Sequence, residues 1–227
     1  MCGRFALYSP GSRIRAHFRL DNDFYHGPRY NIAPMTTVLA VSSRADGART
    51  VGLYRWGLLP GWMKKTTDAK LFNARSETIL EKPAFRTAFR RSRCLIPANG
   101  FYEWKTVREN ERPVKQPYYI RPEHEADLFG FAGLSEYWRS PTGEVIHSCC
   151  IITTAANAFM KPIHHRMPVI LGAGDYGQWL ESGRTDWEAL RALLLPKAAG
   201  MIAYPVSRAV NSSREDSPAL VEPVYRR

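Results

Sequence analysis

Residues 36–57 have the sequence TTVLAVSSRADGARTVGLYRWG. Two runs rich in β-branched and aromatic residues, 36–42 and 50–57, flank the turn Arg44-Ala45-Asp46-Gly47. Asp-Gly between two such runs is a strong hairpin signal, because glycine adopts the positive φ that a tight turn requires. The pattern therefore predicts an antiparallel pair of strands.

The rest of the chain continues with short elements of both kinds. Strands in meander order are predicted at 94–97, 100–105, 127–137, 145–154, 169–171 and 201–206. Short helices are predicted at 12–20, 76–81, 84–91, 176–180 and 186–195, and loops at 21–34 and 58–65. No repeat or long linker divides the chain, so we expect one domain over residues 1–227.

Composition and charge limit the possible functions. The 227 residues are 44% hydrophobic, which is enough for a substantial core, and no run approaches the roughly 18 apolar residues of a membrane span. We expect a soluble cytoplasmic monomer without a membrane partner. The 32 Lys and Arg against 21 Asp and Glu give a net charge of +11, which favours a polyanionic partner, with nucleic acid first and an anionic membrane surface second.

The four cysteines are Cys2, Cys94, Cys149 and Cys150, and no two have C-x-x-C spacing. We therefore expect no metal site and no cofactor, and the adjacent pair lies in an apolar run typical of a buried strand. Removal of Met1 would leave Cys2 with both a free α-amine, which titrates near ~7.7–8.0, and a thiol, near ~8.5. Such a residue can condense with an aldehyde and close a thiazolidine. The alternative is that Cys2 is only a small buried hydrophobe.

Other polar residues interrupt apolar or tight-turn segments. Glu103 lies within an aromatic strand, so burial should raise its pKa and make it a candidate general acid or base. The alternative is a wet position on an edge strand. His164 and His165 lie between two prolines, where a satisfied turn is the common outcome, and Asn73 fits a helix cap or turn.

Trp62 precedes two lysines, Lys64 and Lys65, in the loop predicted at 58–65. An exposed Trp can stack on an unpaired base, which contributes ~1–3 kcal/mol per base, while flanking lysines meet phosphates. The alternative is a Trp folded back into the core.

Several motifs together resemble the SOS response-associated peptidase (SRAP) family, and the resemblance covers almost the whole chain. They are MCGRF at 1–5, PRYNIAP at 28–34, RWGLLP at 55–60, NARSET at 73–78, RCLIPANGFYEW at 93–104, FAGL at 131–134, IHHRMPVIL at 163–171 and PVSRAVN at 205–211. The resemblance implies a single α+β domain, with antiparallel sheets curled into a barrel-like core and flanking short helices. It also implies a protein that crosslinks to abasic sites in single-stranded DNA, nucleoid-associated when bound, with possible lyase or Met1-removing activity.

The resemblance assigns roles by motif position. Cys2 is similar to the nucleophile that forms a thiazolidine with the ring-opened sugar, Asn73 to the residue that positions sugar and amine, Glu103 to the acid/base group, and His164 to the proton donor. The implied DNA contacts are Arg4, Trp62, Arg75, Arg86 and Arg166. His165 and Asn99 each stand where the family often has Asp; His164 is taken as catalytic because it follows an apolar residue and precedes Arg166 by two.

Two other functions fit parts of the sequence. An N-terminal-nucleophile amidohydrolase would use the free amine of Cys2 as the base for its thiol. A non-catalytic module would bind single strands through Trp62 and arginines, with Cys2 incidental. Glutaminase activity without an aldehyde adduct would favour the first, and retained Met1 the second.

Overall fold

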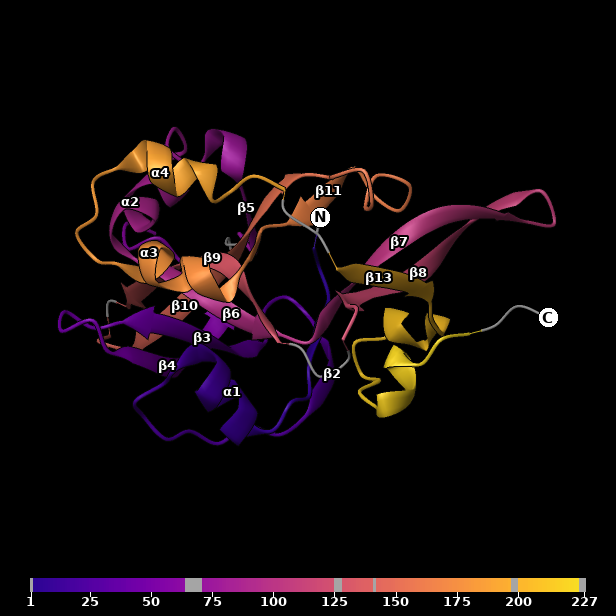
Figure 1. The fold of residues 1–227 in the computed structure, drawn as a ribbon, viewed down its shortest axis with the longest axis horizontal. Helices are drawn as coiled ribbons and strands as arrows, with labels where there is room; N and C mark the ends of the chain where they lie inside the picture. The colour runs from indigo at the N-terminus through magenta and orange to yellow at the C-terminus, as the bar shows by residue number, and fades with distance from the viewer. Residues whose placement is uncertain (1, 64–70, 125–127, 141, 197–199, 225–227) are drawn as a thin grey trace.

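The body of the protein is built from two β-sheets. The computed structural model describes residues 2–63, 71–124, 128–140, 142–196 and 200–224 (Figure 1). The larger sheet has the strand order β11-β10-β4-β3-β6-β9-β12, with β5 beside β10. Its strands are β3 (Thr37–Ser43), β4 (Arg49–Trp56), β5 (Asn73–Arg75), β6 (Arg93–Ala98), β9 (Phe129–Arg139), β10 (Val145–Ala155), β11 (Arg166–Pro168) and β12 (Ile170–Leu171).

The larger sheet closes on itself. Because β9 also pairs with β10, the strands β10, β4, β3, β6 and β9 form a ring in which each is hydrogen-bonded to the next. The α+β class and the barrel-like core are thus confirmed. The meander order is wrong, because β6 lies between β3 and β9, and β10 runs parallel to β4.

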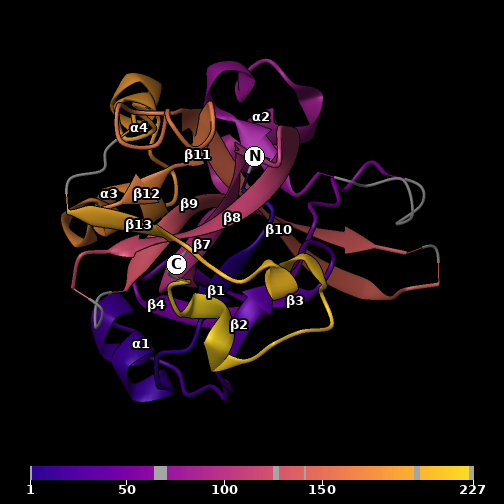
Figure 2. The ribbon, with the colours of Figure 1, turned by 90° about the vertical axis from the view of Figure 1, so that its right-hand side faces the viewer.

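The smaller sheet has the order β13-β8-β7-β1-β2, and its β7–β8 hairpin projects from the body (Figures 1 and 2). Its strands are β1 (Phe5–Leu7), β2 (Arg29–Ile32), β7 (Gly100–Glu109), β8 (Arg112–Pro122) and β13 (Met201–Pro205). The short helices are α1 (Gly11–Phe18), α2 (Pro83–Arg91), α3 (Tyr176–Leu180) and α4 (Trp187–Ala192), with 3-10 turns η2 (Ser76–Thr78), η3 (Ala173–Asp175), η4 (Arg208–Asn211) and η5 (Pro218–Val221). None of the helices described is long and apolar enough to span a membrane.

An aromatic cluster joins the two sheets. Phe5 of the smaller sheet contacts Trp56 edge-on with ring centroids 5.2 Å apart, and Phe131 at 5.7 Å. Phe101 reaches the same Phe131 ring at 6.0 Å. All four side chains are buried, and aromatic pairs in this geometry contribute about 0.5–1.5 kcal/mol beyond their buried area. The first strand is therefore fixed to the barrel only three residues after Cys2.

Strand β8 has no counterpart among the predicted strands, because its prolines argue against a strand. The backbone N–H of Tyr102 in β7 points toward β1, so the even-numbered residues of β7 do not hydrogen-bond to β8. Their partners in β8 are the odd-numbered residues, whose backbone N–H and C=O groups therefore face away from β7. Pro113 and Pro117 take these positions, where a missing N–H breaks no β7–β8 hydrogen bond. The carbonyl of Pro117 accepts instead from Val206, 3.0 Å away on the opposite side.

Two other short strands lie in segments predicted to be irregular or helical. Residues 29–32 fall in the predicted loop but form β2, which pairs with β1. Asn73 was expected to cap or turn, yet it lies on β5 opposite Ile151 of β10. The helix predicted at 76–81 is the single 3-10 turn η2. For β2 and β5, a partner strand distant in sequence supplies the backbone hydrogen bonds.

Gly100 begins β7 at a point where no side chain fits. A Cβ there would lie 2.4 Å from the ring of Tyr119 and 2.7 Å from the backbone oxygen of Ile120. We predict that Gly100→Ala lowers the free energy of unfolding by roughly 1–3 kcal/mol or more, as overpacking does. Urea denaturation measures this against Gly27→Ala, whose Cβ meets nothing within 4 Å. Equal midpoints for the two variants would contradict the packing described for β7.

Candidate active site

Strand β1 fixes the position of Cys2. Phe5 is in register with Ile32 on one side and Phe101 on the other, and Arg4 accepts a hydrogen bond from the N–H of Tyr102 at 2.9 Å. Cys2 is completely buried at the start of this segment. Burial holds the pKa of its thiol far above the ordinary value, and the negative charge of Glu103 raises it further. The thiol is therefore protonated at neutral pH.

Asn73 holds the Cys2 backbone through one end of its amide. Its Nδ2 donates to the Cys2 carbonyl oxygen at 2.8 Å. Its Oδ1 is buried and accepts no hydrogen bond within the part of the chain that the structure describes. A buried acceptor without a donor costs about 1–3 kcal/mol, so this oxygen is suited to an N–H or O–H of a ligand.

Glu103 lies on the inner strand β7, between β1 and β8, and is 2% exposed. The predicted burial is confirmed, and the alternative of a wet edge position is wrong. Burial raises the pKa of the Glu103 carboxyl above its usual range, with smaller opposing effects that include a backbone hydrogen bond from Trp104 and the charge of His165. Because Glu103 also acts on the thiol pKa of Cys2, the two side chains share one electrostatic environment.

His164 precedes β11, and its Nδ1 lies against the backbone of Arg166. The Arg166 N–H is 3.0 Å from Nδ1 and the Arg166 carbonyl oxygen is 3.1 Å from it, so Nδ1 accepts from the first or donates to the second, depending on the tautomer. Burial lowers the His164 pKa, which keeps the ring neutral at pH 7. The His165 ring is stacked on it at 4.3 Å between centroids, and the charge of His164 lowers the His165 pKa.

The two predicted phosphate clamps flank β10. Arg75 on β5 is opposite Thr153, and Arg166 on β11 is opposite Ala155. Arg75 is exposed and forms no ion pair with a residue that the structure describes. Arg166 is 12% exposed and makes a two-point ion pair with Glu77, with Nη1–Oε1 at 2.5 Å and Nη2–Oε2 at 3.0 Å.

The other predicted DNA contacts differ in accessibility. The Arg4 guanidinium is engaged inside the protein, since Nη1 donates to Asn31 Oδ1 at 2.7 Å and to the Val210 carbonyl at 2.8 Å. Arg86 is exposed on α2. Trp62 is 65% exposed, so the alternative of a Trp in the core is wrong. Lys64, Lys65 and Met1 lie outside the described residues.

Sequence reasoning missed Glu77 and Asn31. Glu77 follows Arg75 by two in the NARSET motif, and an acidic residue among basic ones is a signal for an internal ion pair. Asn31 donates through Nδ2 to the carbonyls of Ser212 and Glu215 at 2.9 and 2.7 Å, besides accepting from Arg4. These bonds span nearly the whole chain, so no local pattern could have indicated them.

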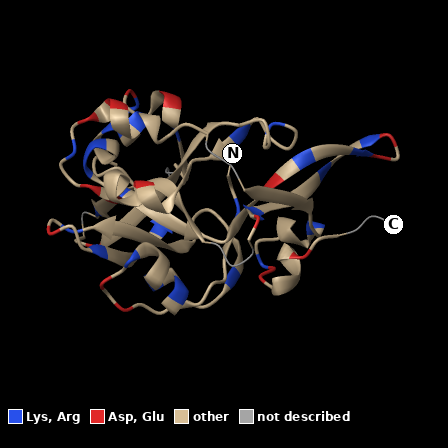
Figure 3. Cartoon of the chain, in the orientation of Figure 1, with Lys and Arg blue, Asp and Glu red and all other residues tan. Residues whose placement is uncertain are grey.

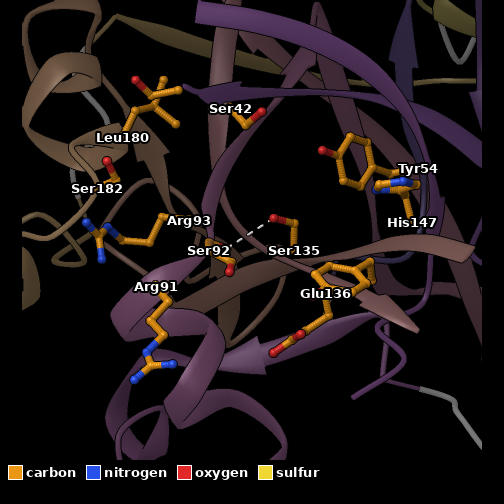
Figure 4. A pocket seen from close by; sticks show the side chains of 12 residues that line it. Ser42, Tyr54, Arg91, Ser92, Arg93, Ser135, Glu136, His147, Leu180 and Ser182 are labelled. Atoms are coloured by element: carbon orange, nitrogen blue, oxygen red, sulfur yellow. Dashed lines mark hydrogen bonds between the residues drawn. The ribbon is translucent and has the colours of Figure 1, made fainter. Parts of the chain in front are cut away.

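A separate polar cavity of about 260 Å³ does not include the predicted catalytic residues. Figure 4 shows Ser135 near its centre, Tyr54 and His147 on one side, and Arg93 and Ser182 on the other. The side chain of Arg93 is buried and engaged, because it donates to the carbonyls of Phe89, Arg90, Trp179 and Glu181. Arg93 therefore has little remaining hydrogen-bonding capacity for a ligand in this cavity.

Within the described residues, no group of three or more His, Cys, Asp or Glu side chains is placed to hold a metal ion. Cys94, Cys149 and Cys150 are buried free thiols in β6 and β10. Burial raises the pKa of each of these thiols, as it does for Cys2. Cys2 alone combines a thiol with the buried polar groups described above.

Comparisons with known proteins agree on one family. The sequence profile described as SOS response associated peptidase (SRAP) matches residues 1–213. Abasic site processing protein YoaM of Bacillus subtilis (strain 168) is 44% identical over 227 residues, covering 98% of each chain. Abasic site processing protein HMCES of Rattus norvegicus is 30% identical, over 98% of this chain and 76% of that one. An X-ray structure from Bacteroides thetaiotaomicron is similar with a TM-score of 0.85 at 28% identity, covering 99% of this chain and 100% of that one.

The ion pair between Glu77 and Arg166 gives a pH-dependent contribution to stability. Hydrogen bonding by Arg166 lowers the Glu77 pKa in the folded state, so the stabilisation is present above the ordinary value near 4.5 and is lost as pH falls through the folded value. We predict that Glu77→Gln destabilises the protein at pH 7 by up to about 1 kcal/mol, since the Glu77 side chain is 47% exposed. The difference from the unmutated protein should shrink toward pH 3.

Urea unfolding from pH 3 to 7 checks this prediction. The matched control is Glu188→Gln, whose carboxylate lies 3.9 Å from Arg191 on the surface and should change stability little at any pH. A Glu77→Gln effect that is the same at pH 3 and pH 7 would show that the loss is not electrostatic.

Proposed function

Because the chain belongs to the SOS response associated peptidase (SRAP) family, we propose that it captures abasic sites in single-stranded DNA through the amine and thiol of Cys2. Removal of Met1 is a necessary step in this proposal, because only a terminal cysteine carries both nucleophiles. The names of the YoaM and HMCES relatives support abasic sites as the substrate.

The observation that carries the proposal is the hydrogen bond from Asn73 to the Cys2 carbonyl. One end of the Asn73 amide fixes the terminal residue at 2.8 Å, while its buried Oδ1 is left for a donor on the amine or the sugar. Glu103 is also buried, and its charge acts on the thiol of Cys2. A purely structural cysteine needs neither a second polar group at its carbonyl nor a buried carboxyl that acts on its thiol.

The proposed reaction has two covalent steps. In the first, the Cys2 amine attacks the C1′ aldehyde of the ring-opened sugar, and loss of one water gives an imine. In the second, Cys2 Sγ bonds to the same carbon and the thiol proton is transferred to nitrogen, which closes the thiazolidine. The net change is the loss of one water, so no oxidant or reductant is required. Ring closure removes the activated imine that would otherwise promote strand cleavage, and a lyase activity would come from the imine stage.

Glu103 and His164 are suited to the proton transfers. A carboxyl whose pKa burial raises above its usual range is a stronger base when ionised and can accept the thiol or amine proton and return it. With Nδ1 of His164 accepting from the Arg166 N–H, the proton on Nε2 would be donated in a hydrogen bond to the sugar ring oxygen when the closed hemiacetal opens. The His164 role starts from the neutral ring, in agreement with the direction of its pKa, whereas Glu103 must be ionised when it accepts a proton.

The strand would be held by groups around these residues. Arg75 is exposed beside Asn73 and can contact a flanking phosphate, which positions a strand without reading its sequence. Arg166 would exchange Glu77 for a phosphate or share its guanidinium between them. Trp62 would stack on an unpaired base, and Arg86 would contribute long-range attraction.

We predict that the mature protein forms an adduct with abasic single-stranded DNA that survives denaturation without borohydride. Cys2→Ser should lose this adduct, because a hydroxyl is a far weaker nucleophile than a thiol, while an imine trapped by borohydride persists. Denaturing gels and intact mass spectrometry measure both species. A full yield of stable adduct from Cys2→Ser would contradict the mechanism, and glutaminase activity without an adduct would favour an amidohydrolase.

A second prediction separates the two adjacent histidines. His164→Ala should slow adduct formation by ~10²- to 10⁴-fold, the usual contribution of a general acid or base, with little change in DNA affinity. His165→Ala is the matched control, because this ring is exposed and only stacked on His164. Single-turnover kinetics at saturating DNA give the rates. If His165→Ala were the slower variant, the assignment of the proton donor would be wrong.

A further inference from the structure

A basic cavity of about 420 Å³ lies between the end of α1 and the segment η3–α3. His17 and Arg19 line it from the first element, Arg49 from the start of β4, and Gly174 and Gly177 from the third. The candidate catalytic residues do not line this cavity, so it is separate from the proposed capture site.

The charges in this cavity are of one sign. Among the described residues, its lining includes two guanidinium groups and an imidazole, and no acidic side chain. Burial lowers the pKa of Arg49, and the positive charge of Arg19 adds to that effect, so the two cations are close enough to repel each other. Asp175 of η3 does not line the cavity; its Oδ2 lies 3.7 Å from the Cβ position of Gly172. A bound anion would offset the repulsion between Arg19 and Arg49.

The basic groups are held in place by the surrounding elements. Arg49 Nη1 donates to the Phe18 carbonyl at 3.2 Å, and His17 Nε2 is 3.1 Å from the hydroxyl of Tyr176. The rings of Phe18 and Tyr176 are stacked at 5.2 Å, which ties α1 to α3. The Cβ position of Gly177 is 3.6 Å from Arg49 Nη2, so a larger residue there would fill the space beside the guanidinium.

Arg19 occupies a backbone position that normally favours glycine. It ends α1 with φ 54° and ψ 58°, in the left-handed region, where a side chain costs free energy and Gly is the usual residue. A cation at such a position suggests a role for its side chain, because glycine would adopt this backbone conformation at a lower cost in free energy.

We propose that this cavity binds a phosphate group, either a free phosphoryl anion or a backbone phosphate of a nucleic acid. Guanidinium groups match phosphate oxygens in planar two-point geometry, and Arg19 and Arg49 present two of them around one space. The inference does not rest on the function proposed for Cys2, because no residue is shared.

Thermal unfolding in pyrophosphate, against sodium chloride of equal ionic strength, tests the free anion. The unmutated protein should unfold at a higher temperature in pyrophosphate, because the folded state alone holds the site. Arg19→Gly and Arg49→Gln should lose this rise. Arg19→Gly is the sharper variant, since glycine suits the left-handed backbone and should fold at least as well without the anion. Arg13→Gln is the control on α1, and it should keep the full rise.

A salt titration of binding to an intact single-stranded oligonucleotide tests the backbone phosphate. The slope of log affinity against log salt is negative, and loss of one phosphate contact reduces its magnitude by ~0.7. A shallower slope in Arg19→Gly and Arg49→Gln assigns the site to a nucleic acid. An unchanged slope together with a lost pyrophosphate shift assigns it to a free anion. Equal behaviour of these variants and the unmutated protein in both experiments would overturn the proposal. Adduct formation with abasic DNA at saturating concentration should stay normal in Arg19→Gly, which keeps this outcome separate from the Cys2 mechanism.

Discussion

The position of the proposed reactive residue depends on the short strand β1. It contributes few hydrogen bonds, but it lies between β2 and β7 and inserts Phe5 against Trp56 and Phe131 of the barrel. A chain end normally frays because few contacts hold it. Here a buried aromatic residue three positions away restricts Cys2, so the position of this terminal nucleophile is as well defined as that of a core residue. Orientation of this kind can supply several kcal/mol of a reaction barrier.

The polar groups around Cys2 are costly for the folded protein and useful for the chemistry. The buried Oδ1 of Asn73 and the buried carboxyl of Glu103 each give up hydration, and Glu103 and the Cys2 thiol oppose each other's ionisation. A protein selected for stability alone would replace them with apolar side chains of similar volume. Their presence in a core otherwise filled by aromatic and aliphatic residues is a physical argument for a reaction at this place.

The sequence was most informative where local chemistry decides the structure. The Asp46-Gly47 turn defines the β3–β4 hairpin, and α2 starts at Pro83, one residue before the helix predicted at 84–91. It was least informative where the partner strand is distant in sequence. Strands β2 and β5 exist because β1 and β10 supply their hydrogen bonds. Strand β8 was missed because its prolines are compatible with the sheet only where the missing N–H would face away from β7. The same limit applies to the candidate site. Motif resemblance pointed to Glu103 and His164. The Glu77–Arg166 ion pair could not be predicted, because it forms only when β10 brings η2 and β11 together.

The distribution of basic side chains changes how the net charge of +11 should be understood. Lys and Arg occur along the whole chain, including the projecting β7–β8 hairpin (Figure 3). Some of the arginines are internal: Arg93 donates to four backbone carbonyls, and Arg4 joins β1 to the carbonyl of Val210 in η4. Such cations strengthen the fold through charge-assisted hydrogen bonds but offer few donors to a ligand. Attraction of a nucleic acid therefore depends on the exposed arginines, and their arrangement in space matters more than the total charge of the chain.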